Sequence, residues 1–227
     1  MRIAEIFYSR QGEGLLTGCQ SVFVRASGCN LRCWFCDTPY TSWAPEGDDL
    51  AVEEVLAQVD AWECDHVVLT GGEPMLFAEL VPLAQALRER GKHITIETAG
   101  TLDLPVACDL MSISPKLSNS LPRGGDARWR RRHERTRHAP EVIRALIGRY
   151  AYQFKFVVDT PADGDEIEAY LAEFPDIDRQ RVLLMPQGTQ LDELQQRAEW
   201  LIPYAAAHGL GYSPRKHIEW YGLTRGT

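Results

Sequence analysis

The sequence contains no apolar run that approaches the roughly 20 residues needed to span a bilayer. Its first residues, MRIAEIFYSRQGEG, also lack the apolar core and small-residue cleavage site of a signal peptide. Basic residues are in the minority, because 24 Lys and Arg stand against 32 Asp and Glu, a net charge of −8. We therefore expect a soluble, cytoplasmic protein without a membrane partner, and the acidic balance argues against a nucleic-acid partner.

Internal repeats, low-complexity tracts and interdomain linkers are absent from the sequence, and its 227 residues fit one large domain. Cysteines number six, and in a reducing compartment they are expected to be free thiols or metal ligands. Cys19, Cys64 and Cys108 are scattered and are predicted to be free or core thiols. The other three lie within eight residues, which is the first sign of a metal site.

Apolar segments of strand length alternate with segments of helical period along the chain. Strands are expected at residues 3–7, 21–26, 66–70, 93–98, 110–114, 153–159, 181–186 and 217–222, and helices around 52–62, 80–87, 167–174 and 191–205. This alternation predicts an α/β fold with a mainly parallel sheet. Because the chain is shorter than the roughly 250 residues of a complete eight-stranded barrel, an incomplete, open TIM-type barrel is favoured.

Short polar or glycine-containing segments follow five of these predicted strands. They are the cysteine loop after 21–26, TGGEP at 70–74, ETAGT at 97–101, SPK at 114–116 and MPQG at 185–188. Ligands gather beyond the carboxyl ends of parallel strands. We therefore expect the five segments to meet in one active site.

The clustered cysteines, Cys29, Cys33 and Cys36, offer three thiolates from a single loop. A structural zinc ion normally takes four protein ligands, and the sequence has no second cysteine pair with matching spacing. A [4Fe-4S] cluster bound by three cysteines keeps one iron open for a small molecule, whereas four cysteines are usual. The spacing favours an iron-sulfur cluster, and a zinc knuckle completed by a distant residue is the alternative.

The segment GCNLRCWFC resembles the cluster motif CxxxCxΦC of the radical S-adenosylmethionine superfamily, with Phe35 as the aromatic before the last cysteine. TGGEP at Thr70 to Pro74 resembles the second signature of the superfamily, which holds the methionine amino group of S-adenosylmethionine. The resemblance implies that the methionine group chelates the open iron. It also implies that one electron from the reduced cluster splits the sulfonium C–S bond and gives a 5′-deoxyadenosyl radical. The cofactors carry this chemistry.

Finer motifs resemble the 7-carboxy-7-deazaguanine synthase family over nearly the whole chain: QGEG at 11–14, CDT at 36–38, TAGT at 98–101, SPK at 114–116 and WYGLTRG at 220–226. That family contracts 6-carboxy-5,6,7,8-tetrahydropterin to 7-carboxy-7-deazaguanine with loss of ammonia, on the route to queuosine and other 7-deazapurines. The resemblance implies a carbon–nitrogen lyase that regenerates S-adenosylmethionine, needs Mg²⁺ and forms a homodimer.

The resemblance also implies site residues, with no side chain acting as acid or base. Substrate contacts are expected from Arg10, Gln11, Gly12, Arg25, Thr70 and the terminal carboxylate of Thr227, and Glu13 can accept from the heterocycle edge. Contacts to S-adenosylmethionine are expected from Phe35, Cys36, Asp37, Gly72, Glu73, Ser114, Pro115, Lys116, Met185, Pro186, Gln187 and Gly188. Thr38 is the expected Mg²⁺ ligand, while the roles of Asp37, Glu73 and Glu97 stay open.

Residues 123–149 are strongly basic in an otherwise acidic chain. The resemblance implies a single radical S-adenosylmethionine domain over residues 1–227, and the basic residues are expected to form a helical insertion in it at about 118–150. A solvated helix or lid is favoured over an RNA contact, and an acidic flavodoxin or ferredoxin docking near the cluster is the more useful hypothesis. His133 and His138 are expected to be exposed, and His217 to serve only packing or hydrogen bonding.

Two other functions compete with the synthase. One is a radical activase of the kind that generates a glycyl radical on a partner enzyme, because such proteins share the cysteine loop and GGEP. The other, from a different class, is a non-catalytic module that binds zinc or RNA.

Overall fold

The computed structural model describes residues 1–124 and 126–227. The strands are β1 (Arg2–Arg10), β2 (Gln20–Ala26), β3 (Asp48–Asp49), β4 (His66–Gly71), β5 (His93–Thr98), β6 (Leu110–Ile113), β7 (Tyr152–Val158), β8 (Val182–Pro186) and β9 (Gly211–Tyr212). The α-helices are α1 (Pro39–Ser42), α2 (Val52–Val59), α3 (Leu80–Glu89), α4 (Ala127–Thr136), α5 (Pro140–Arg149), α6 (Asp163–Glu173), α7 (Leu191–Ala207) and α8 (Lys216–Tyr221). Short 3₁₀ turns are η1 (Pro74–Leu76), η2 (Ser118–Ser120) and η3 (Arg179–Arg181).

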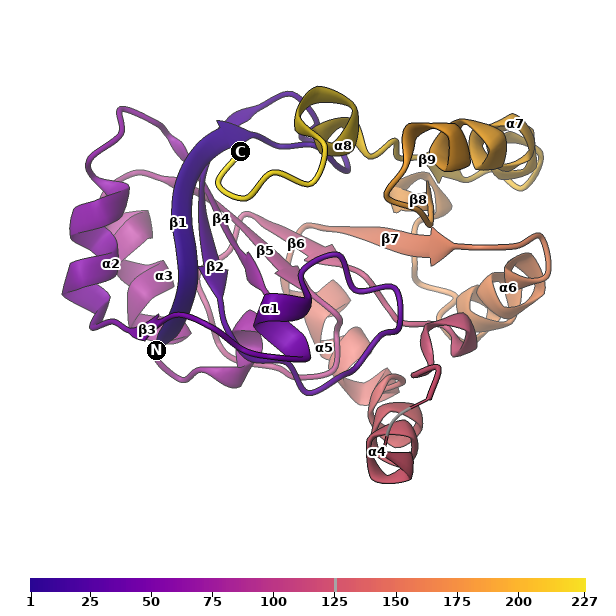
Figure 1. The fold of residues 1–227 in the computed structure, drawn as a ribbon, viewed down its shortest axis with the longest axis horizontal. Helices are drawn as coiled ribbons and strands as arrows, with labels where there is room; N and C mark the ends of the chain where they lie inside the picture. Colours follow the sequence, from indigo (N-terminus) through magenta and orange to yellow (C-terminus); the bar gives the residue numbers. More distant parts are fainter. Residues whose placement is uncertain (125) are drawn as a thin grey trace.

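The strands form one curved sheet in the order β3-β1-β2-β4-β5-β6-β7-β8-β9. All neighbouring strands from β2 to β9 are parallel, whereas β1 is antiparallel to both β2 and β3. The edges, β3 and β9, do not pair with each other, so the sheet stays open (Figure 1). The predicted α/β fold with a mainly parallel, incomplete barrel is confirmed.

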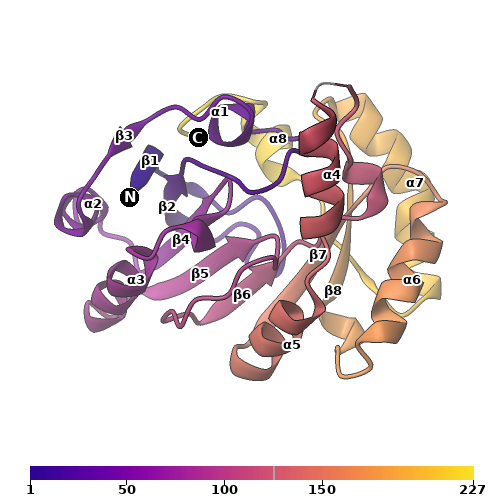
Figure 2. The ribbon, with the colours of Figure 1, turned by 90° about the horizontal axis from the view of Figure 1, so that it is seen from below.

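Alternate side chains of the strands face two different environments, as a period of two dictates. On β7, Phe154 and Phe156 are fully buried and belong to the main apolar core. That core lies between the sheet and the helices α2, α3, α5, α6 and α7, which cover its outer face (Figure 2). The intervening Lys155 points to the concave inner face, where polar side chains from other strands meet it. The outer face supplies stability and the inner face is left for chemistry.

The loop after β1 crosses the concave side of the sheet from one edge region to the other. The amide of Gly14 donates to Ser213 Oγ beyond β9 (2.9 Å), and the amide of Leu15 donates to Gln153 Oε1 on β7 (2.7 Å). The amide of Lys216 in turn donates to the carbonyl of Gly12 (2.9 Å). This floor loop, residues 11–19, bridges the two sides of an otherwise open barrel.

The seven other predicted strands and the four predicted helices are confirmed, but the strand predicted at 217–222 is wrong. These residues form helix α8, with Ile218 buried and a Lys216–Glu219 ion pair across one turn (2.8 Å). A short apolar run cannot be assigned by periodicity alone. Gly222, with φ of 66°, ends the helix, and β9 at residues 211–212 takes the edge position instead.

Helical spacing in the second half of the basic segment is confirmed as α5, which buries Ile143 and Leu146. Helix α4 lies in the first half of that segment. In the part of the chain that the structure describes, no helix combines the length and apolarity needed to cross a bilayer.

Replacement of Phe154 by Ala should lower the free energy of unfolding by about 3–5 kcal/mol, because a fully buried aromatic leaves a cavity in the core. Urea denaturation followed by circular dichroism measures the change. The matched control is Ile202→Ala on α7, where the side chain is 48% exposed and the expected change is below about 0.5 kcal/mol. Equal midpoints for the two variants would contradict the placement of β7.

Candidate active site

One cavity of about 290 Å³ opens on the concave side of the sheet. Its lining includes the cysteine loop, the TGGEP segment, the Ser114 segment, the floor loop and the end of the chain. The predicted residues that line it are Arg10, Gln11, Gly12, Glu13, Arg25, Cys29, Cys33, Phe35, Cys36, Asp37, Thr38, Thr70, Gly72, Ser114, Lys116, Met185, Gln187 and Thr227. Glu73, Pro115, Pro186 and Gly188 are buried behind this lining. The five predicted segments thus meet at one place.

The cysteine loop follows β2 and carries all three clustered thiols into the cavity. The amide of Leu31 donates to Cys29 Sγ (3.4 Å), and Ser42 Oγ donates to Cys36 Sγ (3.2 Å). Hydrogen bonds to sulfur tune the potential of an iron-sulfur cluster. The loop therefore presents its sulfurs to the cavity with donors already in place.

The three clustered thiols are free and line the same cavity. Burial raises the pKa of Cys29 to about 11 and that of Cys33 to about 12, so both are protonated unless a metal ion binds them. Cys64 and Cys108 are buried in the main core, so the described lining of the cavity holds no fourth cysteine. The donor set fits a [4Fe-4S] cluster that keeps one iron open.

The TGGEP segment packs directly against the cysteine loop at Gly72. A Cβ at this position would lie 2.2 Å from the carbonyl oxygen of Gly28 and 2.7 Å from that of Thr41, so only glycine fits. The next residue, Glu73, is fully buried and accepts from Thr98 Oγ1 (2.9 Å) and from the amides of Ala99 (2.9 Å) and Met75 (3.1 Å). Its carboxylate ties β5 to the loop after β4.

Two further predicted residues present polar groups to the cavity. Lys116 Nζ donates to the carbonyl oxygen of Ser114 (2.7 Å) and to its hydroxyl (2.6 Å). Thr38 occupies the N-cap position of α1, yet its side chain makes no capping hydrogen bond. Its hydroxyl instead accepts from Thr41 Oγ1 (3.2 Å) and lies 3.8 Å from Cys36 Sγ.

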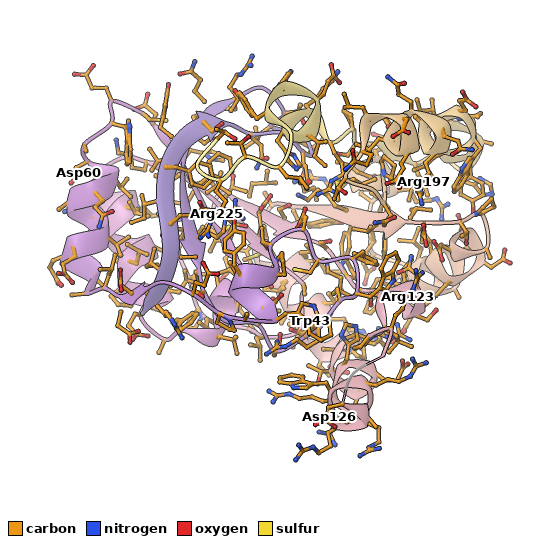
Figure 3. The ribbon with its side chains drawn as sticks, viewed as in Figure 1. Trp43, Asp60, Arg123, Asp126, Arg197 and Arg225 are labelled. Carbon is orange, nitrogen blue, oxygen red and sulfur yellow. The ribbon has the colours of Figure 1, made fainter. Side chains whose placement is uncertain are left out.

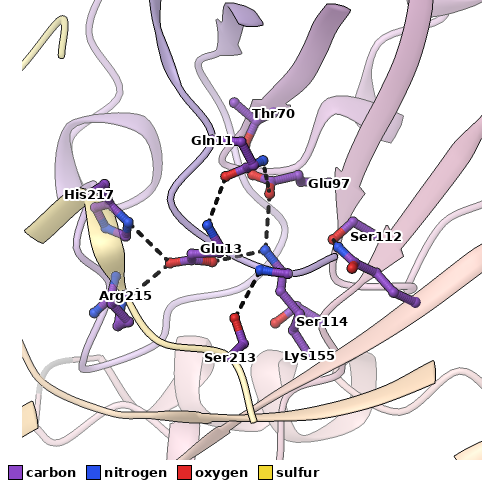
Figure 4. A network of polar contacts seen from close by, with 12 residues as sticks. Gln11, Glu13, Thr70, Glu97, Ser112, Ser114, Lys155, Ser213, Arg215 and His217 are labelled. Carbon is purple, nitrogen blue, oxygen red and sulfur yellow. Dashed lines mark hydrogen bonds and ion pairs between the residues drawn. The ribbon is translucent and has the colours of Figure 1, made fainter. Parts of the chain in front are cut away.

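The inner face of the sheet meets the floor loop in a network of charged groups (Figure 4). Lys155 Nζ donates to Glu13 Oε2 (2.9 Å) and to Glu97 Oε1 (3.0 Å). Glu97 also accepts from Thr70 Oγ1 (2.8 Å) and from Gln11 Nε2 (3.4 Å). One buried cation thereby joins β7, β5 and the floor loop.

A second cation completes this network from the far end of the chain. Arg215 donates from Nε to Glu13 Oε1 (3.3 Å), from Nη1 to the carbonyl of Gly188 (2.6 Å), and from Nη2 to Asp37. His217 Nδ1 lies 3.8 Å from Glu13 Oε1. Gly12 packs against this histidine so closely that an added Cβ would lie 2.6 Å from its Cβ.

The electrostatic balance keeps Glu13 and Lys155 charged despite their desolvation, whereas it leaves His217 neutral. Burial alone would raise the pKa of Glu13, but Lys155 and Arg215 hold that pKa well below its usual range. Burial would likewise lower the pKa of Lys155, yet Glu13 and Glu97 raise it above its ordinary value. Burial and Arg215 lower the pKa of His217, although Glu13 opposes the shift, so this imidazole is neutral at pH 7.

The opposite wall of the cavity comes from β1, β2 and the C-terminal segment. Arg25 Nε donates to Glu5 Oε1 (2.6 Å), and the hydroxyl of Tyr40 donates to the same oxygen (2.7 Å). The guanidinium of Arg225 lies 3.8 Å from the ring centre of Tyr40 and pairs with Glu46 (3.0 Å) (Figure 3). The last residues, 222–227, line the cavity beside them.

The prediction that His133 is exposed is wrong, because this histidine on α4 is fully buried. Its Nδ1 accepts from the amide of Arg32 (3.0 Å), and its Nε2 lies 2.9 Å from Ser120 Oγ. Burial lowers its pKa to about 4, which leaves a neutral acceptor for the cysteine loop. His138 is exposed, as expected.

Lys155, Arg215 and His217 are functional candidates that sequence reasoning missed. A signal existed for Lys155 alone, because it interrupts the apolar run YQFKFVV at a position that alternation turns away from the helices. Arg215 and His217 reach the cavity through the return of the chain end, which local patterns do not reveal.

Comparison with known proteins decides the family. The chain is 47% identical over 227 residues to the 7-carboxy-7-deazaguanine synthase of Rhodopirellula baltica, covering 99% of this chain and 88% of the relative. It is 46% identical to the synthase of Halobacterium salinarum, with 95% and 88% covered. The chain belongs to the 7-carboxy-7-deazaguanine synthase family. The synthase of Pyrobaculum aerophilum is 36% identical, with 100% and 97% covered.

Two further comparisons agree with membership of the 7-carboxy-7-deazaguanine synthase family. The Radical SAM superfamily matches residues 23–120. The crystal structure of QueE from Escherichia coli superposes with a TM-score of 0.69 at 26% identity, covering 94% of this chain and 92% of that one. Streptococcus suis SuiB bound to its precursor peptide, at 15% identity and a TM-score of 0.56, shares the fold over 84% of this chain and 47% of that one.

Family membership identifies a radical S-adenosylmethionine enzyme and implies one [4Fe-4S] cluster and S-adenosylmethionine as cofactors. A small-molecule substrate agrees with this family. The comparisons support the synthase among the three functions considered from sequence, and neither the activase nor the zinc-binding module.

The variant Lys155→Met should destabilise the protein by about 3 kcal/mol at pH 7, because it leaves two partly buried carboxylates without their shared buried cation. Because the pKa of Glu13 is depressed in the folded protein, the Glu13 carboxylate stabilises the fold fully at pH values above 4.5, its ordinary pKa. This stabilisation decreases as the pH falls below 4.5. The difference between wild type and variant should therefore shrink between pH 7 and pH 3.5, as measured by urea unfolding.

The control is Lys216→Met, whose partially exposed ammonium pairs with Glu219 on the surface and should contribute less than about 0.5 kcal/mol. A Lys155→Met difference that stays constant over this pH range, or that equals the control, would show that the ion pairs do not stabilise the fold.

Proposed function

We propose that this protein converts 6-carboxy-5,6,7,8-tetrahydropterin to 7-carboxy-7-deazaguanine with release of ammonia, as a radical S-adenosylmethionine lyase of queuosine or 7-deazapurine biosynthesis. The observation that carries the proposal is one cavity with two chemically different parts. Three thiols for a cluster lie in one part, and a buried network of hydrogen-bonding side chains suited to a pterin lies in the other.

The pterin presents amide and amino donors on one edge and a carboxylate on the other. Glu13 and Glu97 carry the acceptors for the donor edge, and Gln11 and Thr70 lie beside Glu97 to complete it. Arg25 provides a planar cation for the carboxylate. In the absence of substrate these side chains hydrogen-bond to protein groups. Substrate binding would replace these hydrogen-bond partners with groups of the pterin, so that no charged side chain is left without a partner.

The substrate set extends to Arg10, Gly12 and Thr227. Arg10 stacks on Trp220, with its guanidinium carbon 4.3 Å from the ring centre. This contact holds the Arg10 side chain near the chain end. Gly12 keeps the floor loop close to His217. Thr227 lines the cavity.

Cys29, Cys33 and Cys36 would hold the cluster, and S-adenosylmethionine would bind its open iron. When bound, these cofactors supply the radical that removes a hydrogen atom from the substrate. Contacts to S-adenosylmethionine are assigned to Phe35, Asp37, Gly72, Ser114, Lys116 and residues 185–188, with Glu73 and Pro115 holding the neighbouring loops. The site needs no side chain as acid or base.

Thr38 would provide one oxygen ligand to Mg²⁺, because its hydroxyl faces the cavity without serving as a helix cap. Mg²⁺ commonly keeps several waters and takes its remaining ligands from substrate. We also propose that the protein forms a homodimer and that its reductant is an acidic flavodoxin or ferredoxin. The chain would form a single domain with a basic helical insertion at about 118–150.

The reaction is tested with protein reconstituted anaerobically with iron and sulfide, using dithionite, S-adenosylmethionine and the carboxypterin, with and without Mg²⁺. Wild type should form 7-carboxy-7-deazaguanine, detected by mass spectrometry, and Thr38→Val should lose about tenfold or more of the Mg²⁺ stimulation. Thr160→Val, an exposed threonine outside the cavity, should behave as wild type. Unchanged carboxypterin in the wild-type reaction would refute the proposed function.

Cluster binding has its own test in the iron content of the reconstituted protein. Wild type should hold about four irons per chain with broad visible absorbance. Cys33→Ala should lose most of this iron, whereas Cys64→Ala, which removes a core thiol, should keep it. One tightly held zinc per chain, or equal iron in both variants, would rule out the proposed ligands.

A further inference from the structure

Arg215 lies between β9 and α8, where the returning end of the chain lines the cavity. Its side chain is 7% exposed, and all three guanidinium nitrogens donate hydrogen bonds. Nε donates to Glu13 Oε1 (3.3 Å), Nη1 donates to the carbonyl oxygen of Gly188 (2.6 Å), and Nη2 donates to Asp37. Because the guanidinium is planar and its donors point in fixed directions, these contacts fix the three acceptors relative to one another.

The three acceptors of Arg215 belong to different parts of the cavity. Glu13 is in the floor loop and belongs to the polar network assigned to the pterin. Asp37 directly follows Cys36, and Gly188 ends the MPQG segment, both of which are assigned to S-adenosylmethionine. Among residues 1–124 and 126–227, Arg215 provides the only hydrogen bond to the Asp37 carboxylate and to the Gly188 carbonyl. One side chain therefore joins the pterin part of the cavity to the S-adenosylmethionine part.

Lys155 differs from Arg215 in what it connects. Its ammonium bonds the other oxygen of Glu13 (Oε2, 2.9 Å) and an oxygen of Glu97 (3.0 Å), and both carboxylates belong to the pterin part (Figure 4). Lys155 thus fixes the shape of that part from within. Arg215 instead carries the contact from Glu13 across to Asp37.

The backbone on either side of Arg215 is anchored to two separate elements. The amide of Ser213 donates to the carbonyl of Leu184 on β8 (2.9 Å), and the amide of Lys216 donates to the carbonyl of Gly12 in the floor loop (2.9 Å). The side chain therefore extends from a fixed base, so it can set the position of its partners.

The carboxylates that Arg215 contacts lie close enough to repel each other. One oxygen of Glu13, one oxygen of Asp37 and a ring nitrogen of His217 all lie within 4.8 Å of one another. The guanidinium bonds both carboxylates and offsets their repulsion. Lys155 pairs with Glu13, but in the described part of the chain Asp37 has no ion-pair partner other than Arg215. Loss of this guanidinium should therefore move Glu13 and Asp37 apart.

We propose that Arg215 is a positioning residue that holds the pterin part and the S-adenosylmethionine part of the cavity at one fixed separation. The inference rests on the proposed function and adds to it the residue that aligns the two ligands. Each part keeps other polar groups when Arg215 is replaced, such as Lys155 on one side and Lys116 on the other. Each ligand alone should therefore still bind, whereas the two together should no longer meet in the reactive arrangement.

The test compares Arg215→Gln with Arg88→Gln, a control that removes one exposed guanidinium from α3, in protein reconstituted with its cluster. With dithionite, S-adenosylmethionine, Mg²⁺ and the carboxypterin, Arg215→Gln should form product on the order of 100-fold more slowly, because a displacement of about 1 Å can have this effect. 5′-Deoxyadenosine, which remains when cleaved S-adenosylmethionine is not regenerated, should increase by about tenfold or more per molecule of product. The control should match wild type in both measurements.

Binding of each ligand by itself is measured by titration calorimetry without reductant. The dissociation constant of Arg215→Gln for the carboxypterin alone, or for S-adenosylmethionine alone, should rise by less than about fivefold. The iron content should equal that of wild type, because the cysteines are held by other contacts.

The repulsion between the two carboxylates has a test that needs no turnover. Arg215→Gln should lower the melting temperature of the ligand-free protein by about 5 °C, followed by circular dichroism. Adding Asp37→Asn to this variant removes one repelling charge and should recover about half of the loss, whereas Asp37→Asn alone should lower the melting temperature of wild type. Arg215→Lys keeps the charge without the planar fork, so it should melt within about 2 °C of wild type and still form product about tenfold more slowly.

Loss of iron in Arg215→Gln, or binding of either ligand alone that is weaker on the order of 100-fold, would overturn the proposal, because Arg215 would then support folding or binding. An unchanged ratio of 5′-deoxyadenosine to product would also overturn it. So would the same effect of Asp37→Asn on melting in the presence and absence of Arg215. A wild type that forms no product would instead refute the proposed reaction, and the melting temperatures would still decide whether Arg215 couples Glu13 to Asp37.

Discussion

The buried ammonium of Lys155 is the contact on which the geometry of the site depends. An open sheet has no hydrogen-bonded seam to fix the distance between its two sides. Lys155 provides a substitute, because it bonds Glu13 of the floor loop and Glu97 of β5 from its own position on β7. A buried cation between two carboxylates is stable only if both partners stay in place. The same ion pairs that hold the floor loop therefore also hold the shape of the cavity.

This constraint separates the site into two parts with different supports. The cysteine loop lies at the carboxyl end of β2 and is fixed by glycine packing at Gly72 and by the outer contact with His133. The polar network instead depends on the floor loop, which leaves β1 at the end opposite to the cysteine loop because β1 is antiparallel to β2. The clustered cysteines and the polar network thus rest on different loops of one barrel, and a change in the floor loop can alter the network while the cysteines keep their positions.

Features encoded by neighbouring residues could be predicted from the sequence, whereas features created by long-range folding could not. The spacing of Cys29, Cys33 and Cys36 and the order of the strands are local patterns, and both led to the right superfamily and fold. Lys155 meets Glu13 across 142 residues, so their pairing depends on the curvature of the whole sheet. Helix α8 was predicted as a strand because six residues are too few for periodicity to decide. The buried position of His133 was missed because a helix rich in arginine normally marks a solvated surface.

The two sides of α4 show why composition alone is a poor guide to the role of a segment. Its five arginines are typical of a solvated surface, and all five are indeed exposed. Yet the helix also contributes a neutral histidine to the backbone of the cysteine loop, and this bond fails if the imidazole carries a proton on Nδ1. The positive surroundings favour the neutral form, since Arg137 adds to burial in lowering the pKa of His133 to about 4. Burial is the larger cause, and the exposed arginines of α4 are not needed for it, so one helix presents charge to solvent and a neutral acceptor to the loop through different residues.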